Sequence, residues 1–284
     1  MEILITEKSE GYELIDTGDG MKLERYGSVV LSRPEPQAIW SRSLKKDDWD
    51  KADAVFTHGE KNGRWWKKED IKEEFSVDFE GLKFNLKLLP SKHLGLFPEQ
   101  SQNWRWLIDK IKSSGKEVKV LNLFAHTGGA TLACSFAGAE VVHLDASEFP
   151  IKYAKKNLED SGLGKNKVRF IVDDVRKFLE REIKRGNKYD IVIMDPPVYG
   201  KGTNDKVWKI EEDLVPLLLK TKEVLSAEPI AFVLNGYASI YSSLTYKNIL
   251  EQIFRGNVVH GELAIKESSS GKILSAGIFA RWEK

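Results

Sequence analysis

The sequence predicts an α/β fold: a doubly wound, seven-stranded sheet that ends in an antiparallel hairpin, preceded by a small β-rich domain. Two observations favour this fold. Beyond about residue 90, apolar runs suited to buried strands alternate with helical patterns, whereas the preceding residues form short segments between turn residues. We therefore expect two domains, at residues 1–90 and 91–284.

Turn residues divide the first domain into short segments. They occur at 16–20 (DTGDG), 33–36 (RPEP), 61–64 (KNGR) and 79–84 (FEGLKF). Such clusters of Gly, Pro, Asn and Asp are typical of hairpins. The segments between them, for example 22–31 and 64–68, mix aromatic and β-branched residues with polar ones. This pattern predicts a small, mostly antiparallel sheet.

Five apolar runs predict the parallel strands of the second domain. They lie at 118–124, 140–145, 168–173, 189–195 and 229–235. Strands that are covered by helices on both faces need such runs. Helical patterns lie between them, at 130–137, 150–161, 175–185 and 212–225. Alternating strands and helices of this kind predict helical crossovers and a parallel sheet.

The last two strands are predicted to be antiparallel. Residues 258–265 and 272–282 both read as strands, and only KESSSG connects them. This connection is too short for a helical crossover, so the two strands must form a hairpin.

Composition limits the class of protein. The 284 residues are 41% hydrophobic and 31% charged, which excludes collagen-like, disordered and purely coiled-coil chains. The formal net charge is +1, so a nucleic acid would have to bind to a local patch. The single cysteine, the polar N-terminus and the absence of an apolar stretch of membrane-spanning length predict a cytoplasmic protein.

Ligands of open α/β sheets bind at the carboxyl ends of the strands, so residues there are candidates for the site. The first strand is followed by Gly128 and Gly129, which either let the backbone approach a ligand or are plain turn residues. The second ends in Asp145, which suits the hydroxyl groups of a ribose or caps the next helix. The third ends in Asp173 and Asp174, which are either caps or acceptors for an adenine amine.

The fourth strand ends in DPPVYGKG, the most informative segment of the chain. Pro196 and Pro197 lack amide donors and stiffen the backbone, so the carbonyl groups of Asp195 and Pro196 can project into a site. Such acceptors orient a substrate amine, and Tyr199 can pack against a flat base. Beside the other three strand ends, this segment favours an acceptor site over a loop that only ends a strand.

These segments resemble class I S-adenosylmethionine-dependent methyltransferases. More narrowly, they are similar to the bacterial large-subunit rRNA methyltransferases that act on cytosine carbon-5 or guanine nitrogen-7. The resemblance rests on HLGLFPEQ with Trp104, VLNLFAHTGGAT, DASEFPIKYAKKN, FIVDDVRKFL and DIVIMDPPVYGKG. It covers residues from about 90 to 284 well and the β-rich part loosely. It implies a Rossmann-like fold and S-adenosylmethionine as the cofactor.

The resemblance also implies roles for individual residues. Residues 124–128 would wrap the amino-acid end of the cofactor, Asp145 would hold its ribose, and Asp174 rather than Asp173 would meet the adenine amine. The implied cofactor contacts are Phe97, Gln100, Phe124, Ala125, His126, Thr127, Gly128, Asp145, Ala146, Ser147, Asp173 and Asp174. The implied catalytic residues, which face the methyl acceptor, are Asp195, Pro196, Pro197 and Tyr199.

The chain departs from that family at two points. Members that methylate cytosine carbon-5 attack the base with a cysteine, commonly at the end of the fourth or fifth strand, where this chain reads DPPVY and VLNGY. Its one cysteine, Cys134, falls in the first helix and is predicted to pack in the core. Longer members also carry an N-terminal RNA-binding module, which we expect this chain to lack. We therefore expect a nitrogen acceptor rather than carbon-5 of cytosine.

Two local patches are candidates for RNA contact. They mix cations with aromatic rings, which suits phosphate binding and base stacking. The first consists of Lys61, Arg64, Trp65, Trp66, Lys67 and Lys68, and the second of Lys201, Lys206, Trp208 and Lys209. Acidic and basic side chains are equally numerous in residues 41–75, so the first patch is alternatively a solvated mixed-charge face.

The sequence thus predicts a methyltransferase that modifies a base nitrogen in rRNA. Methyltransferases for adenine N6 or protein glutamine are alternatives, although their aromatic residue directly follows the second proline, where this chain has Val198. A nicotinamide-dependent oxidoreductase, which the missing G-x-G-x-x-G disfavours, and a non-catalytic RNA-binding protein are further alternatives. No metal is expected, because the histidines do not occur at ligand spacing.

Overall fold

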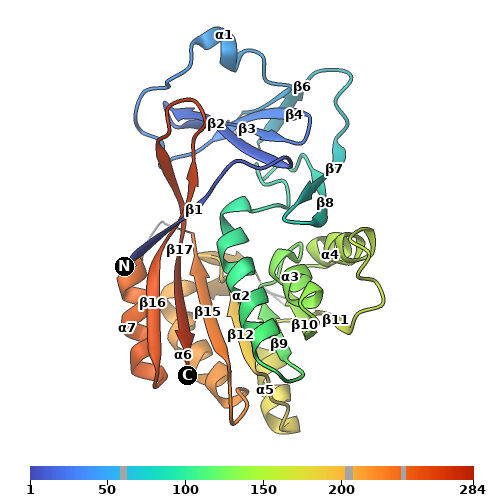
Figure 1. Cartoon of the computed structure of the whole chain (residues 1–284), viewed down its shortest axis with the longest axis vertical. Helices are drawn as coiled ribbons and strands as arrows, with labels where there is room; N and C mark the ends of the chain where they lie inside the picture. The colour runs from blue at the N-terminus through green and yellow to red at the C-terminus, as the bar shows by residue number, and fades with distance from the viewer. Residues whose placement is uncertain (58–62, 202–206, 238–240) are drawn as a thin grey trace. The chain divides into compact units, whose positions relative to one another are not determined.

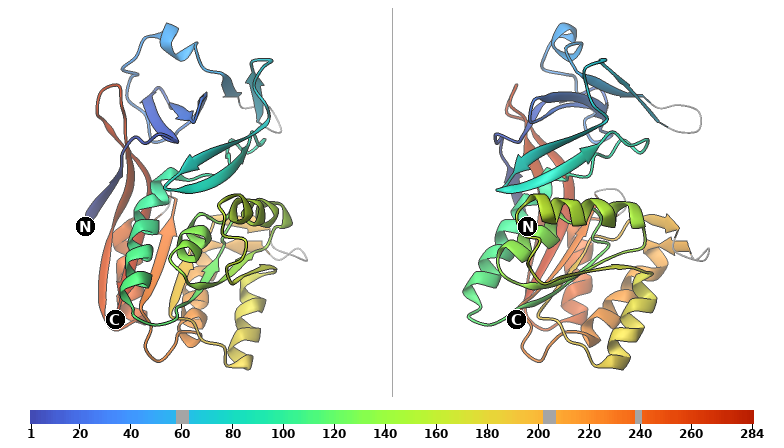
Figure 2. Two further views of the ribbon diagram at one scale, coloured as in Figure 1. Left: turned by 45° about the vertical axis from the view of Figure 1, so that its right-hand side comes forward. Right: turned by 90° about the vertical axis from the view of Figure 1, so that its right-hand side faces the viewer.

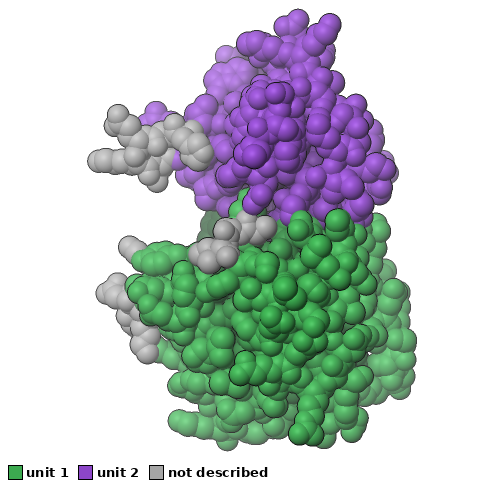
Figure 3. Space-filling model, turned by 90° about the vertical axis from the view of Figure 1, so that its left-hand side faces the viewer, with its two compact units in different colours: residues 1–4, 102–263, 277–284 green, residues 5–101, 264–276 purple. Residues whose placement is uncertain are grey.

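The computed structural model describes residues 1–57, 63–201, 207–237 and 241–284. The chain forms two compact units (Figure 3). The larger unit consists of residues 1–4, 102–263 and 277–284, and the smaller one of residues 5–101 and 264–276. Both units are therefore discontinuous in sequence.

An eight-stranded sheet, most of which belongs to the larger unit, has the order β1-β16-β17-β15-β12-β9-β10-β11 (Figure 1). Its strands are β1 (Glu2–Thr6), β9 (Lys119–Leu123), β10 (Glu140–Asp145), β11 (Val168–Val172), β12 (Ile191–Met194), β15 (Ala231–Gly236), β16 (Asn257–Lys266) and β17 (Ile273–Glu283). Strands β9, β10, β11, β12 and β15 are parallel, and β17 pairs antiparallel with β15. The predicted doubly wound sheet is confirmed.

Helices lie on both faces of this sheet (Figure 2). They include α2 (Ser101–Ser113), α3 (Gly129–Phe136), α4 (Glu148–Asp160), α5 (Val175–Arg185), α6 (Ile210–Glu223) and α7 (Ser243–Ile253). Because side chains alternate along a strand, β9 contributes to two cores. Leu121 and Leu123 pack with α5, α6 and α7, whereas Val120 packs with Leu107 of α2 and Cys134 of α3. Cys134 is a core residue, as predicted.

Three features of the sheet differ from the sequence prediction. Helices α2 and α7 were not predicted, and β1 joins the large sheet as an eighth strand instead of the β-rich domain. In α2, Trp104, Leu107 and Ile111 are buried at helical spacing, so the pattern was present in the sequence. The position of β1 depends on pairing with the distant strand β16, which local sequence does not encode.

The smaller unit contains a five-stranded sheet, β2-β3-β4-β5-β6, and a separate hairpin, β7-β8. Its elements are β2 (Tyr12–Gly18), β3 (Met21–Tyr26), β4 (Val29–Pro34), α1 (Lys46–Trp49), β5 (Ala54–Thr57), β6 (Arg64–Lys67), β7 (Glu74–Phe79), β8 (Leu82–Lys87) and the 3-10 turn η1 (Pro98–Gln100). The predicted β-rich character is confirmed. The single strand expected at 22–31 is wrong, because Gly27, with φ of 58°, turns the chain between β3 and β4.

The tip of the β16–β17 hairpin belongs to the smaller unit. There, the buried Glu267 accepts hydrogen bonds from Thr17 Oγ1 at 2.5 Å and from Ser269 Oγ at 2.8 Å. Asp16, also buried, accepts from Trp49 Nε1 at 2.8 Å and lies 2.7 Å from Ser269 Oγ, whose one proton is shared between Asp16 and Glu267. This unit therefore differs from the predicted domain of residues 1–90, because it includes residues 91–101 and the distant hairpin tip.

Candidate functional site

The turn after β9 has an unusual backbone. Phe124 and His126 have positive φ angles of 56° and 47°, and Gly128, the N-cap residue of α3, has φ of 90°. The amide of Ala125 donates a hydrogen bond to the Leu144 carbonyl at 3.0 Å, which holds the turn against β10. Positive φ is costly for residues with a Cβ atom, and two such residues in one turn indicate a functional loop.

Asp145, at the end of β10, connects this loop to the next one. Its Oδ2 accepts from the His126 amide at 2.9 Å, and its Oδ1 accepts from the Ser147 amide at 2.9 Å. Ser147 and not Asp145 is the N-cap residue of α4, so the alternative in which Asp145 caps that helix is wrong. Each carboxylate oxygen retains a lone pair for a further donor, as binding of ribose hydroxyls requires.

Close packing from α2 and α4 supports the loop. The buried Asn157 donates from Nδ2 to the Thr127 carbonyl at 3.0 Å. A Cβ atom on Gly129 would lie 2.2 Å from the ring of Trp104, and one on Gly128 would lie 3.0 Å from Ala154. Both glycines are therefore needed for packing, and Gly128 also for the turn.

A buried polar layer lies on the α3 side of the sheet. Thr131 Oγ1 is 2.9 Å from Asn122 Nδ2 and 2.9 Å from His143 Nδ1. Burial lowers the pKa of His143 to about 3, so its imidazole is neutral. Burial also lowers the pKa of His126, and the charge of Asp145 opposes that shift. The loop thus carries no imidazolium charge at neutral pH.

The aspartates after β11 are both engaged. Asp174 is the N-cap residue of α5: it accepts from the Arg176 and Lys177 amides at 3.0 and 3.2 Å and pairs with the Arg176 guanidinium. Burial opposes the shift, but the bonds from Arg176 hold the pKa of Asp174 below its usual range. Asp173 pairs with Arg181. Capping is confirmed for Asp174, and an adenine contact stays a prediction for both residues.

Asp195 directly follows β12. Its side chain is accessible, yet desolvation by the surrounding protein raises the pKa of its carboxyl to about 6. Tyr246 lies near it: burial and then the Asp195 charge raise the pKa of the Tyr246 phenol. A carboxyl group that titrates close to neutral pH at the end of a parallel strand suits binding or accepting a proton from a substrate.

The second proline after Asp195 is bonded to a short hairpin of β13 (Tyr199–Lys201) and β14 (Val207–Lys209). Trp208 Nε1 donates to the Pro197 carbonyl at 2.6 Å, and the Trp208 ring lies 5.1 Å from that of Phe124. Trp208 is only 4% exposed. Its predicted role in an RNA patch is therefore wrong, because it packs between the two halves of the site.

Two tyrosines at the strand ends are exposed. Tyr199, in β13, is 57% exposed, and Tyr237, which follows β15, is 47% exposed. Strands β12 and β15 are neighbours, so both rings lie near the ends of adjacent strands. Sequence reasoning did not select Tyr237, although its place directly after the fifth parallel strand was a usable signal.

Two implied cofactor contacts lie in the other unit. Phe97 precedes η1 and Gln100 ends it, and both belong to the smaller unit. The Phe97 ring lies 5.7 Å from the ring of His93. Contact of Phe97 and Gln100 with the cofactor stays a prediction.

In the first basic patch, some side chains are exposed and others are engaged with the protein. Arg64 and Trp66 are exposed, whereas Trp65 contacts the Phe56 ring and donates to the Leu89 carbonyl. Lys68 pairs with Asp53. Parts of the two patches lie outside the described residues, namely Lys61, Lys206 and the side chain of Lys201. In the second patch, Lys209 pairs with Glu212.

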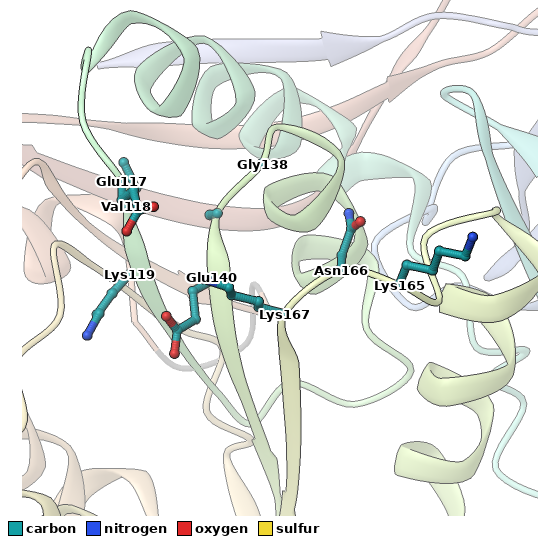
Figure 4. Close-up of a pocket in the computed structure, with 9 residues that line it drawn as sticks. Glu117, Val118, Lys119, Gly138, Glu140, Lys165, Asn166 and Lys167 are labelled. Atoms are coloured by element: carbon teal, nitrogen blue, oxygen red, sulfur yellow. The ribbon is translucent and has the colours of Figure 1, made fainter.

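A cavity of about 260 Å³ lies at the opposite end of the sheet (Figure 4). Its lining includes Val118, Ala139 and Lys167, next to the amino ends of β9, β10 and β11. The charged side chains around it are exposed and point in different directions. Open α/β sheets bind ligands at the carboxyl ends of their strands, so this cavity is not the active site.

In the described ranges, no group of three His, Cys, Asp or Glu residues is arranged to hold a metal ion. No helix in the described part of the chain has the length and apolarity needed to cross a membrane.

Comparisons with known proteins identify one family. The family model of S-adenosylmethionine-dependent methyltransferases matches residues 56–232. A structure of such an enzyme from Agrobacterium tumefaciens is 38% identical, with a TM-score of 0.95, and the match covers 100% of this chain and 93% of that one. A putative enzyme of this type from Streptococcus mutans is 19% identical, with a TM-score of 0.73 over 96% of this chain and 76% of that one, and shares the fold. A putative methyltransferase with the same scores was solved with S-adenosylhomocysteine.

Two curated relatives are named as ribosomal RNA large subunit methyltransferases. One, a putative enzyme from Methanocaldococcus jannaschii, is 33% identical over 45% of this chain and 30% of its own length. The other, methyltransferase I of Enterobacter sp. strain 638, is 38% identical over 30% of this chain and 22% of its own length. This chain thus matches less than a third of each relative.

One family model matches more than half of the chain, and the turn after β9 is consistent with it. Both observations favour a methyltransferase over a nicotinamide-dependent oxidoreductase or a non-catalytic RNA-binding protein. The chain therefore belongs to the S-adenosylmethionine-dependent methyltransferase family and is an enzyme that uses S-adenosylmethionine as its cofactor.

Proposed function

We propose that this enzyme methylates a base nitrogen in ribosomal RNA. One observation carries the choice of nitrogen: the ends of β12 and β15 offer the Asp195 carboxylate and two tyrosines but no thiol. The chain's one cysteine, Cys134, is buried in α3, and burial raises its pKa to about 12. A thiol so rarely ionised and so deeply buried cannot attack a pyrimidine ring.

The acceptor chemistry follows from that lack of a nucleophile. An aromatic carbon such as carbon-5 of cytosine becomes nucleophilic only after another group has added to the ring. A base nitrogen has a lone pair and needs only to be positioned in line with the methyl donor. Asp195 and the Pro196 carbonyl supply acceptors that orient an amine, and the Asp195 carboxylate can take up its proton.

The cofactor half of the site fits S-adenosylmethionine. When bound, that cofactor supplies a methyl group activated by a positively charged sulfur. Residues 124–128 form a fixed loop for its amino-acid end, and Asp145 has lone pairs for its ribose. Ala146 and Ser147 follow Asp145 and are exposed, which suits packing against adenine. Asp173 or Asp174 would meet the adenine amine, and Phe97 and Gln100 would cover the cofactor.

An RNA substrate is supported by the names of the curated relatives and by exposed aromatic rings. Tyr199, four residues after Asp195, is exposed, and Trp66 is exposed with Arg64 on one face of β6. Aromatic rings stack on any base, and cations bind phosphate. An rRNA substrate would place the enzyme in the cytoplasm.

The test is methylation of rRNA by the purified enzyme. Ribosomal RNA from a strain lacking the gene would be incubated with S-adenosylmethionine that carries a labelled methyl group, and rRNA from the parent strain would be the control. We expect label only in the first RNA, and nucleoside mass spectrometry should place it on a base nitrogen. Label on a base carbon, or on protein glutamine and not on RNA, would contradict the proposal.

A further inference from the structure

Asn235 lies next to the proposed acceptor site. Strands β12 and β15 are paired in parallel register, with Met194 opposite Leu234. Asp195 follows Met194, and Asn235 follows Leu234, so the two residues occupy matching positions at the carboxyl ends of neighbouring strands. Side chains alternate along strands, so Asn235, two residues after Val233, lies on the face that packs with α2, where it contacts Asn103.

A hydrogen-bonded chain of three buried side chains leads to Asn235. Arg281 Nε, in β17, donates to Asn103 Oδ1, in α2, at 2.8 Å. Asn103 Nδ2 in turn donates to Asn235 Oδ1 at 2.7 Å. These residues are 7%, 1% and 4% exposed, respectively.

Arg281 sets the direction of every bond in this chain. A guanidinium group can only donate, so the Asn103 atom that faces it must be the amide oxygen. The Asn103 nitrogen must then face Asn235, whose facing atom must also be its oxygen. The Nδ2 group of Asn235 is therefore turned away from Asn103, and no described group accepts a hydrogen bond from it. This result does not depend on how amide oxygen and nitrogen are assigned.

The buried cation has no close counter-charge in the described part of the chain: burial lowers the pKa of Arg281, and only the more distant charge of Glu2 opposes that shift. No described carboxylate forms an ion pair with Arg281, which also donates to the Gln102 carbonyl at 2.9 Å. Its guanidinium carbon lies 4.9 Å from the centroid of the Trp106 ring and 4.8 Å from that of Phe279. Burying a charge without a partner of opposite charge is costly, and an apolar side chain would fill this space at a lower cost. A guanidinium group fixes the direction of a hydrogen-bond chain, because it can only donate, and an apolar side chain cannot do this.

We propose that Asn235 determines base specificity: its Nδ2 group donates a hydrogen bond to an acceptor atom next to the nitrogen that is methylated. Arg281 and Asn103 are positioning residues that keep this donor turned toward the substrate. The inference rests on the proposed function. With Asp195 accepting from one atom of a base edge and Asn235 donating to the next, the site selects a nitrogen beside a ring nitrogen or a carbonyl oxygen.

The decisive variant changes Asn103 and leaves Asn235 in place. In Asn103→Asp, one new carboxylate oxygen accepts from Arg281 and the other can only accept from Asn235. The Asn235 amide must then turn its nitrogen inward and present its oxygen to the substrate. We expect the KM for rRNA from the deletion strain to rise about 10-fold or more, because two acceptors then face each other.

Three measurements separate this effect from a structural one. The melting temperature of Asn103→Asp should not fall, because the new carboxylate pairs with Arg281, and its Kd for S-adenosylhomocysteine should be unchanged. In an Asn235→Ala background, Asn103→Asp should cause no further rise in KM. Asn166→Asp, at the other end of the sheet, adds the same charge and should leave the KM unchanged.

Each outcome supports or contradicts either the proposed function or the inference about Asn235. If the wild-type enzyme methylates no rRNA from the deletion strain, the proposed function is wrong and the inference falls with it. If the wild-type enzyme is active and Asn103→Asp has the same KM, only the inference is wrong. A weaker affinity of Asn103→Asp for S-adenosylhomocysteine would place Asn235 against the cofactor and would also overturn the inference.

Discussion

The two halves of the active site are built differently. At the ends of β9 and β10, loop atoms are bonded to the protein itself: the His126 amide to Asp145, and the Thr127 carbonyl to Asn157. At the ends of β12 and β15, the rings of Tyr199 and Tyr237 are exposed, and Asp195 is accessible. In the first half the loop backbone is held by hydrogen bonds to the protein, whereas the second half also presents exposed aromatic side chains to solvent.

This difference matches the two ligands. The cofactor is a small molecule of constant shape, so a loop fixed in advance avoids the entropy cost of ordering it on binding. The acceptor is a base in a large polymer, which must be positioned by stacking and by a few directed hydrogen bonds. Trp208 connects the halves, because it contacts Phe124 and donates to the Pro197 carbonyl. Variants in one half should therefore change the binding of one ligand and leave that of the other unchanged.

The largest effect is expected from Asp195→Asn in the acceptor half. It should lower the methyl-transfer rate about 100-fold, because it removes the group that accepts a proton, and leave the Kd for S-adenosylhomocysteine unchanged. The wild-type rate should rise as the pH increases through the Asp195 pKa of about 6, and the variant should lose this dependence. Rates measured from pH about 5 to 8 would check both.

A stability measurement provides the control for this variant. The folded-state pKa of Asp195 is above its ordinary value, so the stability contributed by the neutral carboxyl is present at low pH and is lost as the pH rises through about 6. Asp195→Asn should thus melt at a higher temperature than the wild type above that pH. If Asp195→Ala keeps full activity while Asp145→Ala loses cofactor binding, the Asp-Pro-Pro turn is only a scaffold.

The next effect concerns Asp145→Asn in the cofactor half. It should raise the Kd for S-adenosylhomocysteine about 100-fold, because it weakens charge-assisted bonds both to ribose and to the His126 amide. Titration calorimetry would measure the change. Asp78→Asn, at an exposed position of β7, removes the same charge and should have no effect. An unchanged Kd for Asp145→Asn would mean that Asp145 only holds the loop.

A smaller effect, on folding, is expected from Gly129→Ala. The added Cβ atom would lie 2.2 Å from the buried Trp104 ring, and such overpacking costs about 1–3 kcal/mol of unfolding free energy. In the control Gly164→Ala, the Cβ atom would meet only Glu159 at 3.7 Å, an ordinary contact. Urea denaturation of both variants would test this. Equal stability would show that Trp104 moves aside and that the cofactor half is less rigid than its packing indicates.

Much of this architecture was predictable because local patterns encode it. Strand β10 and helix α5 have the predicted bounds, since an uninterrupted apolar run and a capped amphipathic pattern specify both ends. The motif residues lie at the strand ends for the same reason. Trp208 was misjudged because its lysine neighbours indicate a surface, whereas tertiary packing buries it.

The features that the sequence did not predict depend on pairings between distant segments. Asn103, Asn235 and Arg281 form one chain only because α2, β15 and β17 meet in a particular register. The hairpin tip joins the smaller unit through buried acceptors, Glu267 and Asp16, that no local pattern marks. Sequence reasoning from one chain finds residues near motifs and misses polar networks assembled by tertiary contacts.

The smallest effect tests the acceptor half through stacking. Tyr199→Ala should raise the KM for rRNA about 10-fold, because one aromatic ring stacked on a base contributes about 1–3 kcal/mol. Tyr199→Phe keeps the ring and should stay close to the wild type. Leu219→Ala, an exposed apolar position on α6, controls for loss of surface area. If Tyr199→Phe were as impaired as Tyr199→Ala, the hydroxyl would be the functional group and the acceptor half would recognise its base by hydrogen bonds alone.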